Sequence, residues 1–172
     1  ENADILVLVA RVVLQFGDGQ SATGYLKQAL AIEPGNAKAK MRLAGLHLSR
    51  KEHEEVERLV GELIAREKTP RSILSEARTM LASSYAQRNQ ISLAEKEAIK
   101  AMRIDPENPS PRSMLAKIYF KANRLDLAYQ VCKDAIRAGV LDTEILDILG
   151  RIELFSKKDY PKALKAFKSV LN

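Results

Sequence analysis

The sequence predicts an all-α protein built from stacked antiparallel helical hairpins, and three observations support this fold class. Ala, Leu, Lys, Glu, Arg and Ile dominate the chain, and most of these residues favour helices. A short phrase recurs with a period of about 34 residues, which is typical of helical repeats. Within each period, apolar residues are spaced by three and four, which places them on one helical face.

The period is clearest in the first helix of each predicted hairpin. The phrase Leu-Ala-x-x-Tyr begins at Leu81 and again one period later at Leu115. Weaker copies begin at Val9, Leu43 and Leu149. Self-similarity along the whole chain indicates five structural units of one kind.

The second helix of each unit has its own signature of small or apolar residues at offsets of four and three. The triplets are Ala22, Leu26 and Ala29; Val56, Val60 and Leu63; Ala94, Ala98 and Ala101; and Ala128, Cys132 and Ala135. Small side chains allow the two helices of a hairpin to approach closely. A single hairpin cannot bury its own apolar face, so we expect neighbouring hairpins to stack into one continuous core.

Two proline phrases mark the joins between units. "QALAIEPGN" at 28–36 and "KAMRIDPENP" at 100–109 close the first and third units. The separation of Pro34 and Pro106 exceeds two periods by four positions, which predicts an insertion near 71–74. The predicted domain is a single array over 1–172, with units at about 3–36, 37–70, 75–108, 109–142 and 143–172.

Each unit needs a tight turn between its two helices. Gly17, Asn89 and Asn123 stand at equivalent places, and Gly and Asn are the residues that best tolerate a left-handed backbone. Lys51 is the exception at this place. In the first unit we expect Asp18 to cap the second helix, and in the last unit Pro161 falls in the first helical turn.

This pattern resembles the tetratricopeptide repeat (TPR) family, whose period is about 34 residues. The resemblance covers essentially the whole chain and implies a right-handed superhelical solenoid. The chain departs from the family pattern in having no Trp, and in having Lys68 and Val140 where the closing proline would fall. The resemblance also implies a protein–protein interaction scaffold, within a multi-protein assembly, whose concave wall is formed mainly by the first helices and binds a peptide or helix.

Projected onto this sequence, the resemblance predicts a partner-binding groove of mixed character. Small residues would leave room for a ligand, methionine and phenylalanine would form an apolar floor, and basic residues would favour an amphipathic, partly acidic peptide. The predicted groove residues are Val7, Arg11, Lys38, Met41, Gly45, Leu48, Thr79, Ser83, Ala86, Gln87, Ser113, Lys117, Phe120, Lys121, Asp147 and Arg151, with Leu14 and Phe155 at the two ends.

The sequence contains no catalytic constellation, so we expect no enzymatic activity, no cofactor and no metal. His47 replaces the tyrosine of the repeat and is predicted to pack between helices, whereas His53 is predicted to be exposed near a turn. Cys132 occupies an alanine position of the repeat and is predicted to be buried and unreactive. "GDGQSATG" at 17–24 follows no strand and is therefore a helix–helix turn rather than a phosphate loop.

Several functional alternatives remain open at this point. TPR domains that grip the acidic tails of chaperones use a set of Lys, Asn and Arg residues, which none of the three-unit windows reproduces, so we expect no such clamp. The net charge of +6 is dispersed, which disfavours nucleic acid, although an RNA-binding helical repeat is an alternative. Another alternative is a docking or regulatory region of a larger enzyme, or part of a bacterial envelope secretion or assembly system. Both a cytoplasmic and a periplasmic location fit the sequence.

The first predicted helix is apolar on nearly every side. "DILVLVARVVLQF" at 4–16 is too short to span a bilayer, and we expect no membrane insertion. A helix that is apolar all round is usually buried. Because the sequence opens on Glu1 and resembles a piece of a longer protein, we expect this helix to be covered by another repeat or a partner, with self-association as a further possibility.

Overall fold

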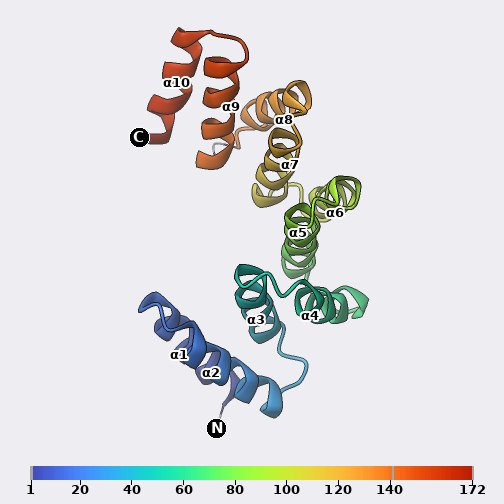
Figure 1. Ribbon diagram of the computed structural model, residues 1–172. Helices are drawn as coiled ribbons and strands as arrows, with labels where there is room; N and C mark the ends of the chain where they lie inside the picture. The colour runs from blue at the N-terminus through green and yellow to red at the C-terminus, as the bar shows by residue number, and fades with distance from the viewer. Residues whose placement is uncertain (1, 141, 172) are drawn as a thin grey trace.

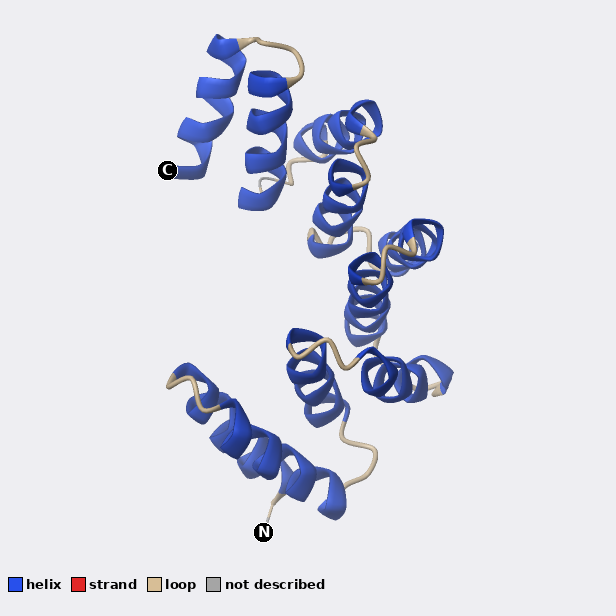
Figure 2. Cartoon of the chain, in the orientation of Figure 1, coloured by secondary structure: helices blue, strands red, loops and turns tan. Residues whose placement is uncertain are grey.

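The computed structural model describes residues 2–140 and 142–171, and this part of the chain folds into helices joined by short turns, with no strand (Figure 2). The helices in these two ranges are α1 (Ala3–Gln15), α2 (Gly19–Ile32), α3 (Ala37–Ser49), α4 (His53–Ala65), α5 (Arg71–Gln87), α6 (Ile91–Ile104), α7 (Ser110–Lys121), α8 (Leu125–Arg137), α9 (Thr143–Phe155) and α10 (Tyr160–Leu171).

The helices form five antiparallel hairpins that stack into a superhelical solenoid, which confirms the predicted fold class. Each odd-numbered helix packs against the helix that follows it, and each even-numbered helix from α2 to α8 packs against the first helix of the next hairpin. Helices α3, α5, α7 and α9 also contact one another in sequence. In Figure 1, α3, α5 and α7 lie on the inner side of the curve, and α4, α6 and α8 lie on the outer side.

The core runs along the solenoid as two adjoining clusters, one from α1 to α5 and the other from α5 to α10. Each predicted triplet of the second helices is buried in it, with exposed fractions of 0–1%. The partners of these triplets on the first helices are small, and Ala10, Ala44, Ala82 and Ala116 are fully buried. Close approach of the paired helices therefore depends on side chains no larger than a methyl group.

The turns within the hairpins take the left-handed conformation that the sequence predicts. The backbone φ angles are 80° at Gly17, 59° at Asn89 and 56° at Asn123. Lys51 adopts the same conformation, with φ of 61°, although a residue with a Cβ atom pays about 1–2 kcal/mol for it. The geometry of the repeat thus overrides the local preference at this turn, and again at Lys158 between α9 and α10, with φ of 54°.

The predicted helix starts are also observed. The Asp18 carboxylate accepts a hydrogen bond from the Ser21 N–H at 2.9 Å and caps α2. Hydrogen bonding by the Ser21 side chain, and then by its N–H, lowers the pKa of Asp18. Pro161 is the second residue of α10, where its missing N–H leaves no helical hydrogen bond unmade.

Helix α5 is one turn longer than α1 and α3, with 17 residues against 13. The residues at 71–74, where the sequence suggests an insertion, form its first turn. From this turn, Arg71 donates hydrogen bonds to the Ile104 carbonyl at 2.7 and 3.0 Å, at the end of α6. The extra turn therefore caps a helix end whose carbonyls have no helical partner.

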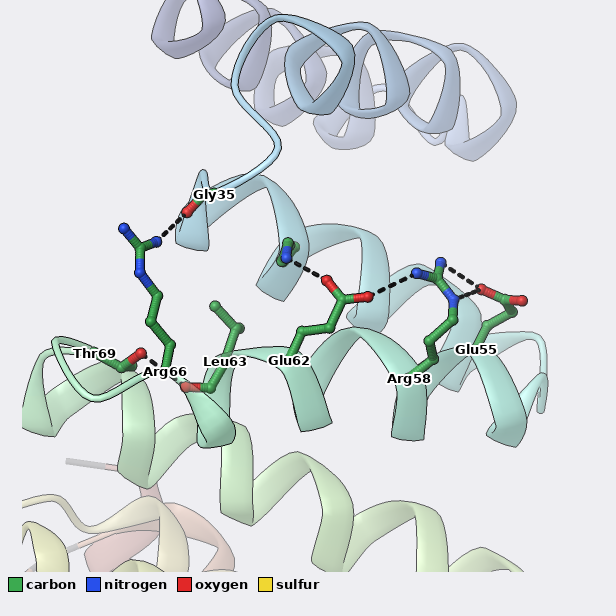
Figure 3. A network of polar contacts seen from close by, with 8 residues as sticks. Gly35, Glu55, Arg58, Glu62, Leu63, Arg66 and Thr69 are labelled. Carbon is green, nitrogen blue, oxygen red and sulfur yellow. Dashed lines mark hydrogen bonds and ion pairs between the residues drawn. The ribbon is translucent and has the colours of Figure 1, made fainter.

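The join between α4 and α5 lacks the closing proline and is held by polar contacts instead (Figure 3). The Thr69 hydroxyl donates to the Leu63 carbonyl at 2.7 Å, and Arg66 donates to the Gly35 carbonyl at 2.8 Å. Farther along α4, Arg58 binds Glu55 and Glu62, and Lys40 of α3 also binds Glu62 and lowers its pKa. The Thr69 contact thus holds the join at Lys68, and Pro70 two positions later is the N-cap of α5.

At the other position without a proline, glycine ends the helix. Gly139 follows the C-cap residue of α8 and has a φ of 77°, and the N–H of Val140 donates to the Ala135 carbonyl at 2.9 Å. This is the usual way in which a left-handed glycine satisfies the last carbonyls of a helix.

Candidate functional site

The inner surface of the solenoid contains a depression of about 300 Å³ between α3 and α5. Its lining residues are Lys38, Met41, Arg42, Ile73, Glu76 and Met80. Two of these, Lys38 and Met41, belong to the predicted groove. Gly45 borders the same depression, because a Cβ atom added to it would lie 3.9 Å from Met80 Cε. Glycine here leaves the methionine room to move.

Sequence reasoning assigned no groove role to Arg42, Ile73, Glu76 and Met80. Ile73 comes to the depression because α5 carries an additional N-terminal turn beside α3, and Glu76 lies just after that turn. The signal that could have indicated this is the insertion near 71–74, which lengthens one wall of the groove. Methionine side chains adapt to differently shaped apolar partners, so Met41 and Met80 suit a binding floor.

A second inner depression of about 270 Å³ lies between α7 and α9 and includes Phe120, Arg151, Ile152 and Phe155. The Arg151 guanidinium lies over the Phe120 ring, with 4.8 Å from Cζ to the ring centroid. Phe155 is 74% exposed, which is unusual for a phenylalanine beside an apolar depression. The structure therefore brings the predicted residues Phe120 and Arg151 together at the rim of an apolar surface.

The positive bias of the predicted groove is smaller than its residue types suggest. Lys117 pairs with Glu144 at 2.5 Å, and Arg151 pairs with Asp147 at 3.6 Å. Within residues 2–140 and 142–171, Arg11, Lys38, Arg42 and Lys121 form no ion pair with another side chain. Free positive charge is thus available at α1, at the α3–α5 depression and at the end of α7.

The assignment of two residues to the predicted groove is wrong, because the structure buries their side chains. Val7 is 5% exposed and packs into the first core cluster, where its apolar surface is removed from water. Ser113 is 4% exposed on α7, which packs against α5, and its hydroxyl donates to the Pro109 carbonyl at 3.3 Å. Neither side chain is available to a partner.

The remaining predicted residues lie on the first helices at varied depth. Thr79 is half-buried, and its hydroxyl donates to the Ser75 carbonyl at 2.8 Å within α5. Leu48 packs partly against the first core cluster. Ser83 and Ala86 are half-buried on α5, and Gln87 is exposed at its end.

Another depression, with a volume of about 560 Å³, lies among α2, α3 and α4. Leucines form part of its lining, and charged residues surround them. Apart from Lys27, these charges already bind carboxylates or guanidinium groups nearby, since Lys40 pairs with Glu62 and Arg58 pairs with Glu55 and Glu62. Neutralised charges offer a partner little electrostatic attraction, so this depression is a weaker candidate than the inner surface.

The two histidines have structural contacts. His47 is buried, as predicted, and its Nδ1 binds the Glu52 carboxylate. The prediction that His53 is exposed is wrong, because its ring is half-buried between α4 and α5, with Nδ1 3.0 Å from the Ser84 hydroxyl. In the part of the chain that the structure describes, three or more His, Cys, Asp or Glu side chains nowhere gather as a metal-binding group.

Cys132 is fully buried in the second core cluster, as predicted, and burial raises the pKa of its thiol to about 12. Since only the thiolate reacts readily, we expect the folded chain to resist thiol reagents at pH 8 and to react within minutes once unfolded in guanidinium. Labelling with a chromogenic disulfide, with and without denaturant, measures this. Equal rates in the two conditions would show that α8 opens freely in the native state.

Across residues 2–140 and 142–171, each helix is too short or too polar to cross a lipid bilayer.

Comparisons with known proteins agree with this architecture. A profile described as tetratricopeptide repeat matches residues 2–72 and 85–152, which together make up most of the chain. No curated protein sequence matches the chain.

Solved structures with the same fold are similar along nearly the full chain. PilF of Pseudomonas aeruginosa has a TM-score of 0.79 and 15% identity, over 98% of this chain and 75% of that one. A tetratricopeptide repeat protein from Thermus thermophilus has a TM-score of 0.75 and 19% identity, over 98% and 90% of the two chains. One from Parabacteroides merdae has a TM-score of 0.83 and 17% identity, and the match covers 99% of this chain and 64% of that one. At these identities the likeness establishes the fold.

Proposed function

The chain belongs to the tetratricopeptide repeat family, and we propose that it is a non-catalytic interaction scaffold that holds a peptide or helix of a protein partner on its inner surface. Proteins of this family are generally scaffolds. The observation that carries the proposal is the α3–α5 depression, where Met41, Ile73 and Met80 meet two unpaired cations, Lys38 and Arg42.

The chemistry of this depression supports an amphipathic, acidic partner. An apolar side chain of the partner would be buried on the methionines, and burying a leucine-sized side chain contributes about 1.5–3 kcal/mol. A carboxylate next to it would lie near Lys38 and Arg42, while Glu76 on the opposite helix would disfavour a second one. One apolar anchor flanked on one side by acidic residues is therefore the expected motif.

The α7–α9 depression supports a second contact with the same partner. Phe120 and Phe155 offer aromatic surface, and the Arg151 guanidinium is already oriented by Phe120 and Asp147. Arginine and aromatic residues are over-represented among the residues that dominate binding energy. An extended or helical segment along the inner surface would reach both depressions.

RNA binding receives less support from the same surface. An RNA-binding face would need a continuous basic stripe with free aromatic rings. Lys117 and Arg151 are engaged by Glu144 and Asp147, and the guanidinium of Arg151 occupies one face of Phe120. These contacts interrupt the basic stripe in the last two hairpins, where the sequence places basic residues most closely together.

Selection from a random peptide library tests the proposal. We expect retained peptides to share an apolar residue next to Asp or Glu, and to bind with an affinity that Met80→Glu lowers at least about tenfold, because the new charge faces the apolar anchor. Fluorescence anisotropy with a labelled peptide measures the change. The matched control is Leu93→Glu on α6, which replaces an exposed leucine of the outer helices.

Peptides that bind wild type and Met80→Glu equally, but lose affinity in Leu93→Glu, would place the binding surface on the outer helices. Selected peptides without acidic residues, and without any effect of Lys38→Glu, would contradict the charge argument while leaving the apolar contact in place.

A further inference from the structure

Helix α1 presents a stripe of exposed apolar side chains. Ile5, Leu8, Val12 and Phe16 are 58%, 50%, 47% and 84% exposed. Their spacing of three, four and four residues places them on one face of the helix. Contiguous apolar surface of this kind marks an interaction site.

The repeat register shows what this face meets elsewhere in the chain. The position of Ile5 is occupied in α3, α5, α7 and α9 by Ala39, Ala77, Pro111 and Ile145, all of which are buried.

The position of Val12 gives a similar result. Its equivalents on the later first helices are the half-buried Leu46 and the buried Ser84, Ile118 and Ile152. Ser84 directly contacts His53 of α4, the second helix of the preceding hairpin. The equivalents of Leu8 on α3 and α5, Arg42 and Met80, instead line the α3–α5 depression. The Ile5 and Val12 part of the stripe therefore belongs to the face that a preceding second helix covers in the later hairpins.

Helix α10 presents the opposite half of the same junction. Tyr160 and Leu164 are 64% and 54% exposed. At the position of Leu164, the other second helices carry Thr23, Glu57, Glu95 and Tyr129, all of which are half-buried.

Each of those four residues contacts the next hairpin. Arg50 lies 3.3 Å from the Thr23 hydroxyl, Arg88 pairs with Glu57, Arg124 lies 3.4 Å from Glu95, and Lys157 Nζ lies 3.0 Å from the centroid of the Tyr129 ring. Each internal junction thus joins a basic residue of the turn after a first helix to a polar or aromatic residue of the preceding second helix.

The exposed faces of α1 and α10 carry apolar residues, Phe16 and Leu164, at the two positions that make this polar contact in the internal junctions. Phe16 follows α1 directly, as Arg50 and Arg88 follow α3 and α5. Leu164 stands where the internal second helices place the partner of that turn residue. A junction between α10 and α1 would therefore bring together two apolar side chains in place of a charge and its partner.

We propose that α1 of one copy of this chain packs on α10 of a second copy, which extends the solenoid from head to tail. The contact uses both exposed faces and neither inner depression, so it is independent of partner binding. Because the two faces differ, the contact is heterologous and leaves a free face at each end of every dimer. The expected product is an open series of oligomers that grow with concentration.

Two single variants block opposite faces. We expect the weight-average mass of the wild type in sedimentation equilibrium to exceed that of a dimer as the concentration rises from about 5 to 500 μM. Phe16→Glu and Leu164→Glu should each be monomeric, with the contact weakened at least about 30-fold, because each places a charge against apolar surface. Leu93→Glu on α6 is the matched control and should assemble as the wild type does.

Mixing the two variants gives the sharpest result. Phe16→Glu keeps an intact α10 face and Leu164→Glu keeps an intact α1 face, so an equimolar mixture should form a dimer and nothing larger. A wild type that is monomeric throughout would overturn the proposal and leave the α1 face to another protein or a further repeat. A dimer that persists in Leu164→Glu would also overturn it, in favour of α1 packing on α1.

Discussion

Replacing Leu26 with alanine is expected to lower the free energy of unfolding by about 2–5 kcal/mol. Leu26 of α2 is fully buried in the first core cluster. Its position is opposite the first helices, where Ala10 and Ala44 are too small to fill the space that the substitution would open. The cavity would persist, so the cost should lie toward the upper part of this range.

Urea unfolding followed by circular dichroism measures this loss. Ile32→Ala in the same helix is the matched control, because Ile32 is 48% exposed and should cost less than about 1 kcal/mol. In a stacked array each hairpin depends on its neighbours, so the Leu26 variant should lose α1 and α2 first and broaden the transition. Equal losses in the two variants would mean that α2 is not packed as the structure has it.

Replacing Gly150 with alanine is expected to destabilise the last hairpin by about 1–3 kcal/mol. A Cβ atom at this position would lie only 2.6 Å from the ring of Phe167, so the ring or the whole of α10 would have to shift. The four preceding hairpins carry alanine at the same place, and the residue opposite it in them is smaller than phenylalanine. In the last hairpin the first helix therefore carries the smaller residue, Gly150, and the second helix carries the larger one, Phe167.

A compensating substitution at Phe167 should restore the stability lost in Gly150→Ala. The double variant Gly150→Ala/Phe167→Leu recreates the pair that Ala10 and Leu26 form in the first hairpin, and should recover at least half of the lost stability. Thermal unfolding of the wild type, both single variants and the double variant gives the coupling energy. Additive losses, without recovery, would show that Gly150 and Phe167 do not determine the spacing of α9 and α10.

Most of the fold could be predicted from the sequence because the same residue pattern recurs in several successive units. The position shared by Gly17, Asn89 and Asn123 predicted a left-handed turn, and Lys51 adopts it because its neighbours in the repeat impose the geometry. The buried triplets followed from helical spacing alone. Such features depend on contacts within one hairpin or between two successive hairpins, where sequence period and spatial neighbourhood coincide.

The inner surface was less predictable because its depressions form between helices of different hairpins. The α3–α5 depression takes its shape from Met80 and from the extra turn of α5, and neither belongs to the repeat rule. Likewise, residue type suggested that Lys117 is a free cation, whereas its pairing with Glu144 depends on how closely α7 and α9 approach. The prediction of Val7 as a groove residue was wrong because the repeat position indicates which way a side chain faces but not how deeply it is buried.

Position-resolved photo-crosslinking inside cells tests most directly whether the inner surface holds the partner. A photoreactive phenylalanine analogue would replace Ser83 on the inner helix α5 in one experiment and Leu93 on the outer helix α6 in another. The proposed function predicts one crosslinked protein from Ser83, with an acidic, amphipathic segment at the attachment site found by mass spectrometry, and none from Leu93. A partner captured from Leu93 and not from Ser83 would contradict it.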